Sequence, residues 1–147
     1  RAMMEEAVGR ALAAGITPAQ LKTLHALVDA MGRAVKACDA DAYHLLNLDF
    51  HDKLVEFSGK RKLTVIYRQL INELSLFRRL NLADEKMMPL SASEHDAILK
   101  AIAGGDPERA ARAMREHVLE SRDRTLRNNT PANDAQASPP RKVRHHA

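Results

Sequence analysis

The sequence has little of what marks several large classes of protein. Its single cysteine, Cys38, excludes an intramolecular disulfide framework and is typical of a reducing compartment. It has no tryptophan and only 3% aromatic residues, too few for the stacking platform that binds single-stranded nucleic acid. No apolar run approaches the ~18 residues of a membrane span, and the first residues do not resemble a signal peptide. We therefore expect a cytoplasmic domain with no membrane partner.

A concentrated basic stripe, the usual mark of a surface that binds duplex DNA, is also missing. The formal net charge is +4. Residues 128–147 contribute +2 of this, because they hold three basic residues and one acidic residue, and +2 remains for residues 1–127. There, basic and acidic residues alternate along each expected helix, as on a solvated surface. We do not expect this chain to bind DNA by itself.

What the sequence does contain is a series of helical segments. Hydrophobic residues make up 45% of the chain, and they recur at the three- and four-residue spacing of amphipathic helices. Glycines and prolines separate the segments, and no alternating strand pattern or internal repeat is present. The sequence thus predicts an all-α antiparallel bundle of about six helices, over residues 2–14, 18–36, 40–58, 62–82, 91–103 and 107–127.

Capping signals place several of these boundaries. Thr17 and Gln20 form a capping box around Pro18, and Ser91 with Glu94 indicates another after a loop over 83–90. The fourth helix is expected to bury Ile66, Leu70, Ile71, Leu74 and Phe77, and Cys38 is expected to be a small buried residue. We expect residues 1–127 to form one domain, and 128–147 a flexible basic tail whose composition cannot pack a core.

Three of the seven histidines lie on predicted inward faces, one on each of three helices. They are His51, His95 and His117. Asn47 lies one helical turn before His51 on the same face. Neutral imidazole is the commonest metal ligand, and three imidazoles with an oxygen donor suit Zn²⁺, Ni²⁺ or Mn²⁺. The alternative is three separate buried histidines, each bonded to a carbonyl or carboxylate.

Two motifs in order resemble a known family. The strings NLDFHDKLVEFSGKRKL and SEHDAILKAIAGGDPERAARAMREHV are similar to the FCD domain, the effector-binding C-terminal half of FadR-subfamily GntR transcription regulators. The family pattern has an acidic or amide residue four before the histidine of an FH pair, followed later by an EH motif and a final histidine. The opening RAMMEEAVGRALAAGITPAQLKTL also fits the family's first two helices. The resemblance covers about residues 1–127.

The resemblance implies a helical bundle that binds a divalent metal ion and a small effector, commonly a carboxylate. It implies His51, His95 and His117 as metal ligands, with Asn47 at a position that is often Asp in the family. It also implies a homodimer, and an N-terminal winged helix-turn-helix domain, absent from this chain, that binds operator DNA. The abrupt start of the sequence fits a piece cut from such a protein.

Two departures from the family pattern bear on the site. The Asn47 amide is a neutral and weaker donor than a carboxylate, so the metal would be held less tightly and an anionic effector would complete its coordination. The alternative is that the metal has been given up and Asn47 hydrogen-bonds a ligand. Lys60 replaces the usual Asn after Gly59, which concerns the helix-ending turn. For an effector carboxylate, Arg78 is the inward-pointing candidate, unless its stem only covers apolar surface.

The leading hypothesis is an effector-sensing and dimerisation domain of a transcription regulator, and not an enzyme. A metal-dependent hydrolase-like protein is the first alternative. It needs a general base near the metal, and Glu94 points about 100° away from its neighbour His95, while Glu120 has no other support. A metal-free dimerisation module is the second alternative. The effector, the metal, the operator and the direction of regulation do not follow from the sequence.

Overall fold

The computed structural model describes residues 1–82 and 87–129, and the side chains of these ranges except 75–82 and 128–129. Within them the chain forms six α-helices and no strand, which confirms the predicted all-α fold. No described helix has both the length and the apolar character needed to cross a membrane. The helices are α1 (Ala2–Gly15), α2 (Pro18–Lys36), α3 (Ala40–Phe57), α4 (Arg61–Leu82), α5 (Met87–Ala103) and α6 (Pro107–Asn129).

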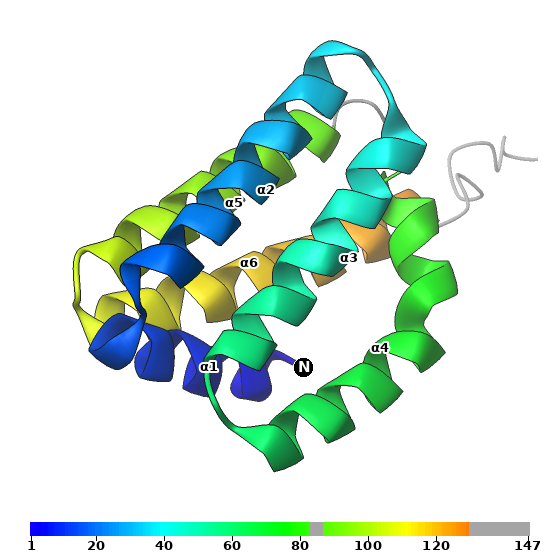
Figure 1. Ribbon diagram of the computed structural model, residues 1–147. Helices are drawn as coiled ribbons and strands as arrows, with labels where there is room; N and C mark the ends of the chain where they lie inside the picture. The colour runs from blue at the N-terminus through cyan, green and yellow to red at the C-terminus, as the bar shows by residue number, and fades with distance from the viewer. Residues whose placement is uncertain (83–86, 130–147) are drawn as a thin grey trace, which may run out of the picture.

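The helices pack in an order that differs from their order along the chain. The α1 helix packs mainly on α6, α6 on α5, α5 on α2, and α2 on α3, while α4 contacts both α3 and α6 (Figure 1). The α1 helix also contacts α3 and α5. As a result, the inward faces of α1, α3, α5 and α6 meet in the middle of the bundle.

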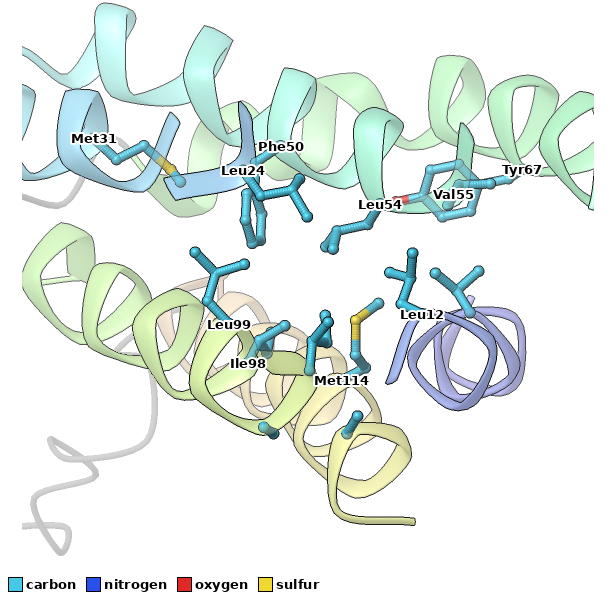
Figure 2. Packing of buried hydrophobic residues seen from close by; sticks show 14 of the residues in the cluster. Leu12, Leu24, Met31, Phe50, Leu54, Val55, Tyr67, Ile98, Leu99 and Met114 are labelled. Carbon is cyan, nitrogen blue, oxygen red and sulfur yellow. The ribbon is translucent and has the colours of Figure 1, made fainter. Parts of the chain in front are cut away.

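Buried aliphatic and aromatic side chains fill the space between these helices. Figure 2 shows Leu12 and Met114 facing Leu54, with Phe50 and Leu24 facing Leu99. Helices α1 and α6 meet at Gly9 of α1, where an added Cβ would lie 2.7 Å from the carbonyl oxygen of Ala110 on α6. The absence of a side chain at this position therefore allows α1 and α6 to approach closely.

The helix boundaries follow from local chemistry. At the start of α2, the Thr17 hydroxyl accepts from the Gln20 amide at 3.3 Å, and the Gln20 side chain accepts from the Thr17 amide at 2.9 Å. The predicted capping box at Thr17 is thus confirmed. After α3, Gly59 adopts φ +70°, a left-handed conformation that glycine adopts without strain. Lys60 in place of the family's Asn therefore does not prevent the turn.

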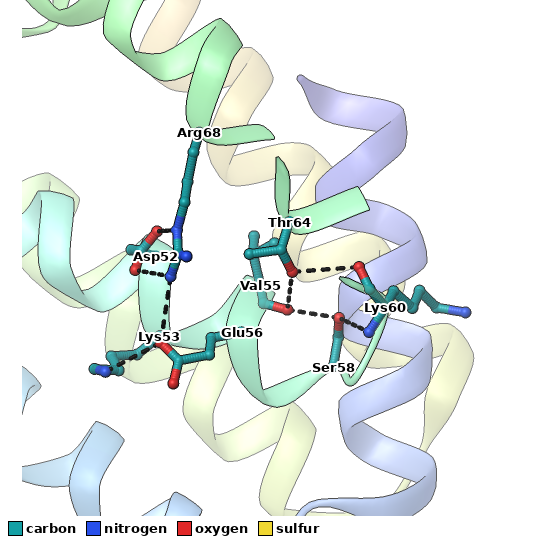
Figure 3. A network of polar contacts seen from close by, with 8 residues as sticks. All are labelled: Asp52, Lys53, Val55, Glu56, Ser58, Lys60, Thr64 and Arg68. Atoms are coloured by element: carbon teal, nitrogen blue, oxygen red, sulfur yellow. Dashed lines mark hydrogen bonds and ion pairs between the residues drawn. The ribbon is translucent and has the colours of Figure 1, made fainter. Parts of the chain in front are cut away.

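Polar contacts fix the corner between α3 and α4 (Figure 3). The hydroxyls of Ser58 and Thr64 both donate to the Val55 carbonyl, at 2.7 and 3.5 Å. One turn further along α4, the Arg68 guanidinium donates to both oxygens of Asp52, at 2.7 and 2.8 Å. These contacts set the direction of α4 and thereby place Tyr67, whose side chain is buried against α3 and α1.

Three local predictions were wrong. Helix α5 begins at Met87, four residues earlier than expected, since Pro89 lies in the first turn, where its missing N–H is not needed. Ser91 is consequently buried inside the helix and does not cap it. Cys38 is exposed in the turn after α2, with φ +52°. Ile66 is 57% exposed, because α4 packs through the face that carries Tyr67.

Candidate metal centre

The structure brings the three predicted histidines together. His51 comes from α3, His95 from α5 and His117 from α6, and all three side chains are buried. One nitrogen atom of each ring lies within 4.8 Å of the other two, so the cluster could hold a metal ion. Their convergence depends on the whole bundle, because 44 residues separate the first two along the chain.

The Nε2 atoms of His51 and His117 lie 3.1 Å apart, and the two rings are nearly parallel, with centroids 5.0 Å apart. The His95 ring lies 5.3 Å from that of His51 and 4.7 Å from that of His117. If two nitrogens each bind an ion at ~2.05 Å and the angle between the two bonds is tetrahedral, the nitrogens are about 3.3 Å apart. This is close to the separation of the two Nε2 atoms.

Each imidazole has a polar partner at Nδ1, the nitrogen away from the cluster in His51 and His117. The His51 Nδ1 lies 3.0 Å from Oε2 of Glu5, and the His117 Nδ1 lies 2.7 Å from Oε2 of Glu94. The hydroxyl of Tyr43 lies 3.5 Å from Nδ1 of His95. A carboxylate or hydroxyl behind each ligand is the usual means by which proteins orient metal-bound histidines.

Both carboxylates are ionised despite their burial. Burial acts to raise the pKa of Glu5, but the charge of Arg1 and the contact with His51 outweigh it and hold that pKa well below its usual range. Burial also acts to raise the pKa of Glu94, yet hydrogen bonds from His117 and Arg124 lower it. An ionised carboxylate only accepts hydrogen bonds, so the Nδ1 of His117, which is hydrogen-bonded to Glu94, carries a proton. The Nδ1 of His51 lies 3.0 Å from Oε2 of Glu5 without hydrogen-bond geometry, so this contact is electrostatic and leaves the tautomer of His51 open.

Both imidazoles, in turn, are neutral. Burial lowers the pKa of His51 to about 3, although Glu5 acts in the opposite direction. Burial likewise lowers the pKa of His117, against the opposing effect of Glu94. A neutral imidazole protonated at Nδ1 has an unprotonated Nε2, so the Nε2 of His117 directs a lone pair at the Nε2 of His51, 3.1 Å away. Neutral imidazole nitrogens are the form that binds a metal ion.

Asn47 is a further candidate oxygen donor on the helix of His51. It lies one turn before His51 on α3, its side chain is buried, and its Oδ1 has no hydrogen-bond partner among the described residues. A buried carbonyl oxygen without a partner is costly, and coordination of a cation would satisfy it. Three imidazoles and one amide oxygen are a chemically suitable donor set for Zn²⁺, Ni²⁺ or Mn²⁺. The residues present therefore fit a divalent metal ion.

A cavity of about 370 Å³ lies between the start of α1, α4 and α6, and none of the three histidines lines it. Its walls are largely apolar, and Arg1 contributes a cation. The Arg1 Nε donates to Glu5 at 2.6 Å, while its buried Nη2 has no hydrogen-bond partner within the described chain. The lining residues are Arg1, Ala2, Leu74, Val118, Leu119, Ser121, Arg122, Thr125 and Leu126.

Sequence reasoning missed the residues that support the histidines. Glu94 reaches across to His117 on α6, although it does point away from its neighbour His95. Glu5 and Arg1 looked like ordinary polar residues of an Ala- and Met-rich helix. The position of an acidic residue on the buried face of this helix was the signal that could have identified Glu5. Arg78 belongs to α4, but its side chain lies outside the described residues, so its predicted role is untested.

Comparisons with known proteins agree with this architecture. Residues 1–120 match the family model of the FCD domain. A solved structure, Streptococcus agalactiae GntR, superposes with a TM-score of 0.68 at 26% sequence identity, over 88% of this chain and 56% of that one. The chain thus spans about half the length of that protein. No curated protein is significantly similar to the chain.

Proposed function

We propose a function on the premise that the chain belongs to the FCD domain family. The members of this family are effector-binding domains of GntR regulators and are not enzymes. In this proposal His51, His95, His117 and Asn47 hold a divalent metal ion, Zn²⁺, Ni²⁺ or Mn²⁺. The observation that carries it is the convergence of three buried imidazoles, two of them with Nε2 atoms 3.1 Å apart. When bound, the ion supplies a positive charge that an anionic effector can coordinate.

The effector is a small carboxylate-bearing metabolite that occupies the cavity between the start of α1, α4 and α6. A volume of about 370 Å³ suits a small molecule, and its apolar walls suit a short carbon skeleton. The Arg1 guanidinium has a buried, unpartnered Nη2 at this cavity and also contacts Glu5, which in turn contacts His51. A carboxylate in the cavity can therefore pair with Arg1, which is linked to His51 through Glu5. Arg78 remains a second candidate for the same role, with Asn47 as a hydrogen-bonding partner.

The sensor acts on DNA through a part of the regulator outside this chain. We expect an N-terminal winged helix-turn-helix domain to bind operator DNA, and residues 1–127 to bind the effector and form a homodimer. Residues 128–147 are expected to be a flexible basic tail, and the regulator is expected to be cytoplasmic. An effector changes operator affinity only if it binds the DNA-competent and DNA-incompetent arrangements with different affinities. The metal-dependent hydrolase-like alternative is not supported, because the FCD family is regulatory. A metal-free dimerisation module is the remaining alternative.

Thermal unfolding of the chain with a panel of small mono-, di- and tricarboxylic acids tests the effector part of this proposal. We expect at least one acid to stabilise the Zn²⁺-loaded chain by about 2.7 kcal/mol at 100 times its dissociation constant. The same acid should have a much smaller effect on the chelator-treated chain. A panel without effect on either form would contradict a carboxylate sensor, and stabilisation of both forms alike would support a metal-free pocket.

A further inference from the structure

The buried carboxylate of Glu5 joins three helices at one point. Its Oε1 accepts from Arg1 Nε at 2.6 Å and from the Tyr67 hydroxyl of α4 at 2.8 Å. Its Oε2 lies 3.0 Å from Nδ1 of His51 on α3. The Glu5 side chain is completely buried, so water does not compete for these contacts.

The other carboxylate of the centre has a similar arrangement. Both oxygens of Glu94 accept from Arg124, at 2.6 and 2.8 Å, and Oε2 also faces His117 at 2.7 Å. Each of two histidines in the cluster is thus backed by a glutamate, and each glutamate pairs with an arginine that neutralises its charge. The difference is that the Glu94 unit joins only α5 and α6, whereas the Glu5 unit includes the first turn of α1 and the buried hydroxyl of α4.

We infer that Glu5 is a positioning residue of the metal centre, which holds the His51 ring with Nε2 towards the ion and so couples metal occupancy to the first turn of α1. This inference rests on the proposed metal function. A cation at Nε2 draws electron density from the ring and strengthens the Nδ1–carboxylate contact. By linkage, an ion that strengthens this contact also restrains Glu5, and a restrained Glu5 raises the affinity for the ion.

The coupling reaches the start of α1. Its first turn carries Arg1 and Glu5, and the same Arg1 lines the cavity proposed for the effector. Metal binding at His51 therefore restrains this helix start. The structure provides a physical route from His51 to the cavity through two side chains, Glu5 and Arg1.

The test compares Glu5→Gln with Glu6→Gln in the 147-residue chain. Glu6 is the next residue on α1 and pairs with Arg10 near the surface, so its variant is a matched control. We expect Glu5→Gln to weaken Zn²⁺ binding, measured by competition with a chelating dye, by roughly 10–100-fold and to change the visible spectrum of the Co²⁺-loaded chain. Glu6→Gln should match the unaltered chain in both measurements.

Hydrogen exchange gives a second readout that is independent of affinity. At saturating Zn²⁺, the amides of the first turns of α1 should become more protected in the unaltered chain and in Glu6→Gln, but not in Glu5→Gln. If Glu5→Gln fails to fold, Tyr67→Phe keeps the carboxylate and removes one of its anchors, and a several-fold loss of Zn²⁺ affinity is expected.

The outcomes separate this inference from the proposed function. If the unaltered chain binds Zn²⁺ and Glu5→Gln binds it equally well with an unchanged Co²⁺ spectrum, the positioning role is wrong and the metal function stands. If Glu5→Gln does not fold and the folded Tyr67→Phe variant binds Zn²⁺ as tightly as the unaltered chain, the positioning role is also wrong. If the unaltered chain binds no metal, the proposed function fails first and this inference fails with it.

Discussion

The Nε2 atoms of His51 and His117 face each other across 3.1 Å, while the Nδ1 atoms of the same rings face the carboxylates of Glu5 and Glu94. The hydrogen bond with Glu94 fixes the tautomer of His117, whose Nε2 lone pair points at the Nε2 of His51. Two imidazole nitrogens at this separation are suited to bind one cation. The central claim, that the histidine cluster is a metal centre, depends on this relationship.

Replacement of Asn47 by Asp should strengthen the metal site and weaken the metal-free fold. A carboxylate attracts a divalent cation where an amide does not, and ~1.4 kcal/mol of added attraction corresponds to a tenfold tighter dissociation constant. Without metal, the new charge is buried at a position that is 4% exposed and lowers stability. Zn²⁺ titration and urea unfolding with and without a chelator measure both effects.

The control for this substitution is Asn72→Asp, which adds the same charge on an exposed part of α4. It should leave both Zn²⁺ affinity and stability nearly unchanged. If Asn47→Asp binds Zn²⁺ no more tightly than the unaltered chain, Asn47 does not lie in the coordination sphere. Its buried oxygen would then be assigned to an effector instead.

Replacement of Arg124 by Met should destabilise the bundle through Glu94. The change keeps most of the apolar stem but removes both hydrogen bonds to a carboxylate that is 25% exposed. Loss of one partner of a buried pair costs 3–5 kcal/mol, and the partial exposure of Glu94 reduces the expected loss to about 2 kcal/mol. Urea unfolding of the metal-free chain measures it.

Arg122→Met is the matched control on the same helix. Arg122 pairs with the neighbouring Asp123 at the surface, where such pairs contribute at most about 1 kcal/mol. Equal stability of the two variants would show that the Arg124–Glu94 pair does not support α5 and α6.

Replacement of Gly9 by Ala tests the close packing of α1 on α6. The new Cβ would meet the Ala110 carbonyl at 2.7 Å, so the helices must separate, and overpacking of this kind costs about 1–3 kcal/mol. Gly32→Ala is the control, since Gly32 lies within the last turns of α2 with no neighbouring atom within 4 Å of the added Cβ. It should stabilise the chain by ~0.5–1 kcal/mol, because Gly lowers helix stability relative to Ala. A Gly9→Ala chain as stable as Gly32→Ala in thermal unfolding would contradict the packing.

The fold was largely predictable from the sequence, because each helix carries its own local signals. The capping box at Thr17 and the left-handed Gly59 are determined by neighbouring residues, and both were found where expected. The start of α5 was missed because Ser91 and Glu94 fit a capping box locally, whereas both are engaged in tertiary contacts. The buried face of α4 was wrong at Ile66 for a similar reason, since helical spacing does not say which of two apolar faces a neighbour covers.

The candidate site was predictable only in part. The inward faces of three helices identified His51, His95 and His117, since an imidazole on an apolar stripe is visible in the sequence. Glu5 and Arg124 were not identified, because their partners lie 46 and 30 residues away along the chain, and only the packed bundle brings them together. The supporting residues of a site assembled from separate helices therefore require a structure.

Metal content of the purified chain, compared with His95→Ala, tests the central claim most directly. After incubation with Zn²⁺, Ni²⁺ or Mn²⁺ and removal of excess ion, elemental analysis should find about one equivalent of at least one of them in the unaltered chain. The His95→Ala variant should retain far less while its circular dichroism still shows a helical fold. No bound metal in the unaltered chain after incubation with all three ions, or equal metal in both proteins, would contradict the metal centre.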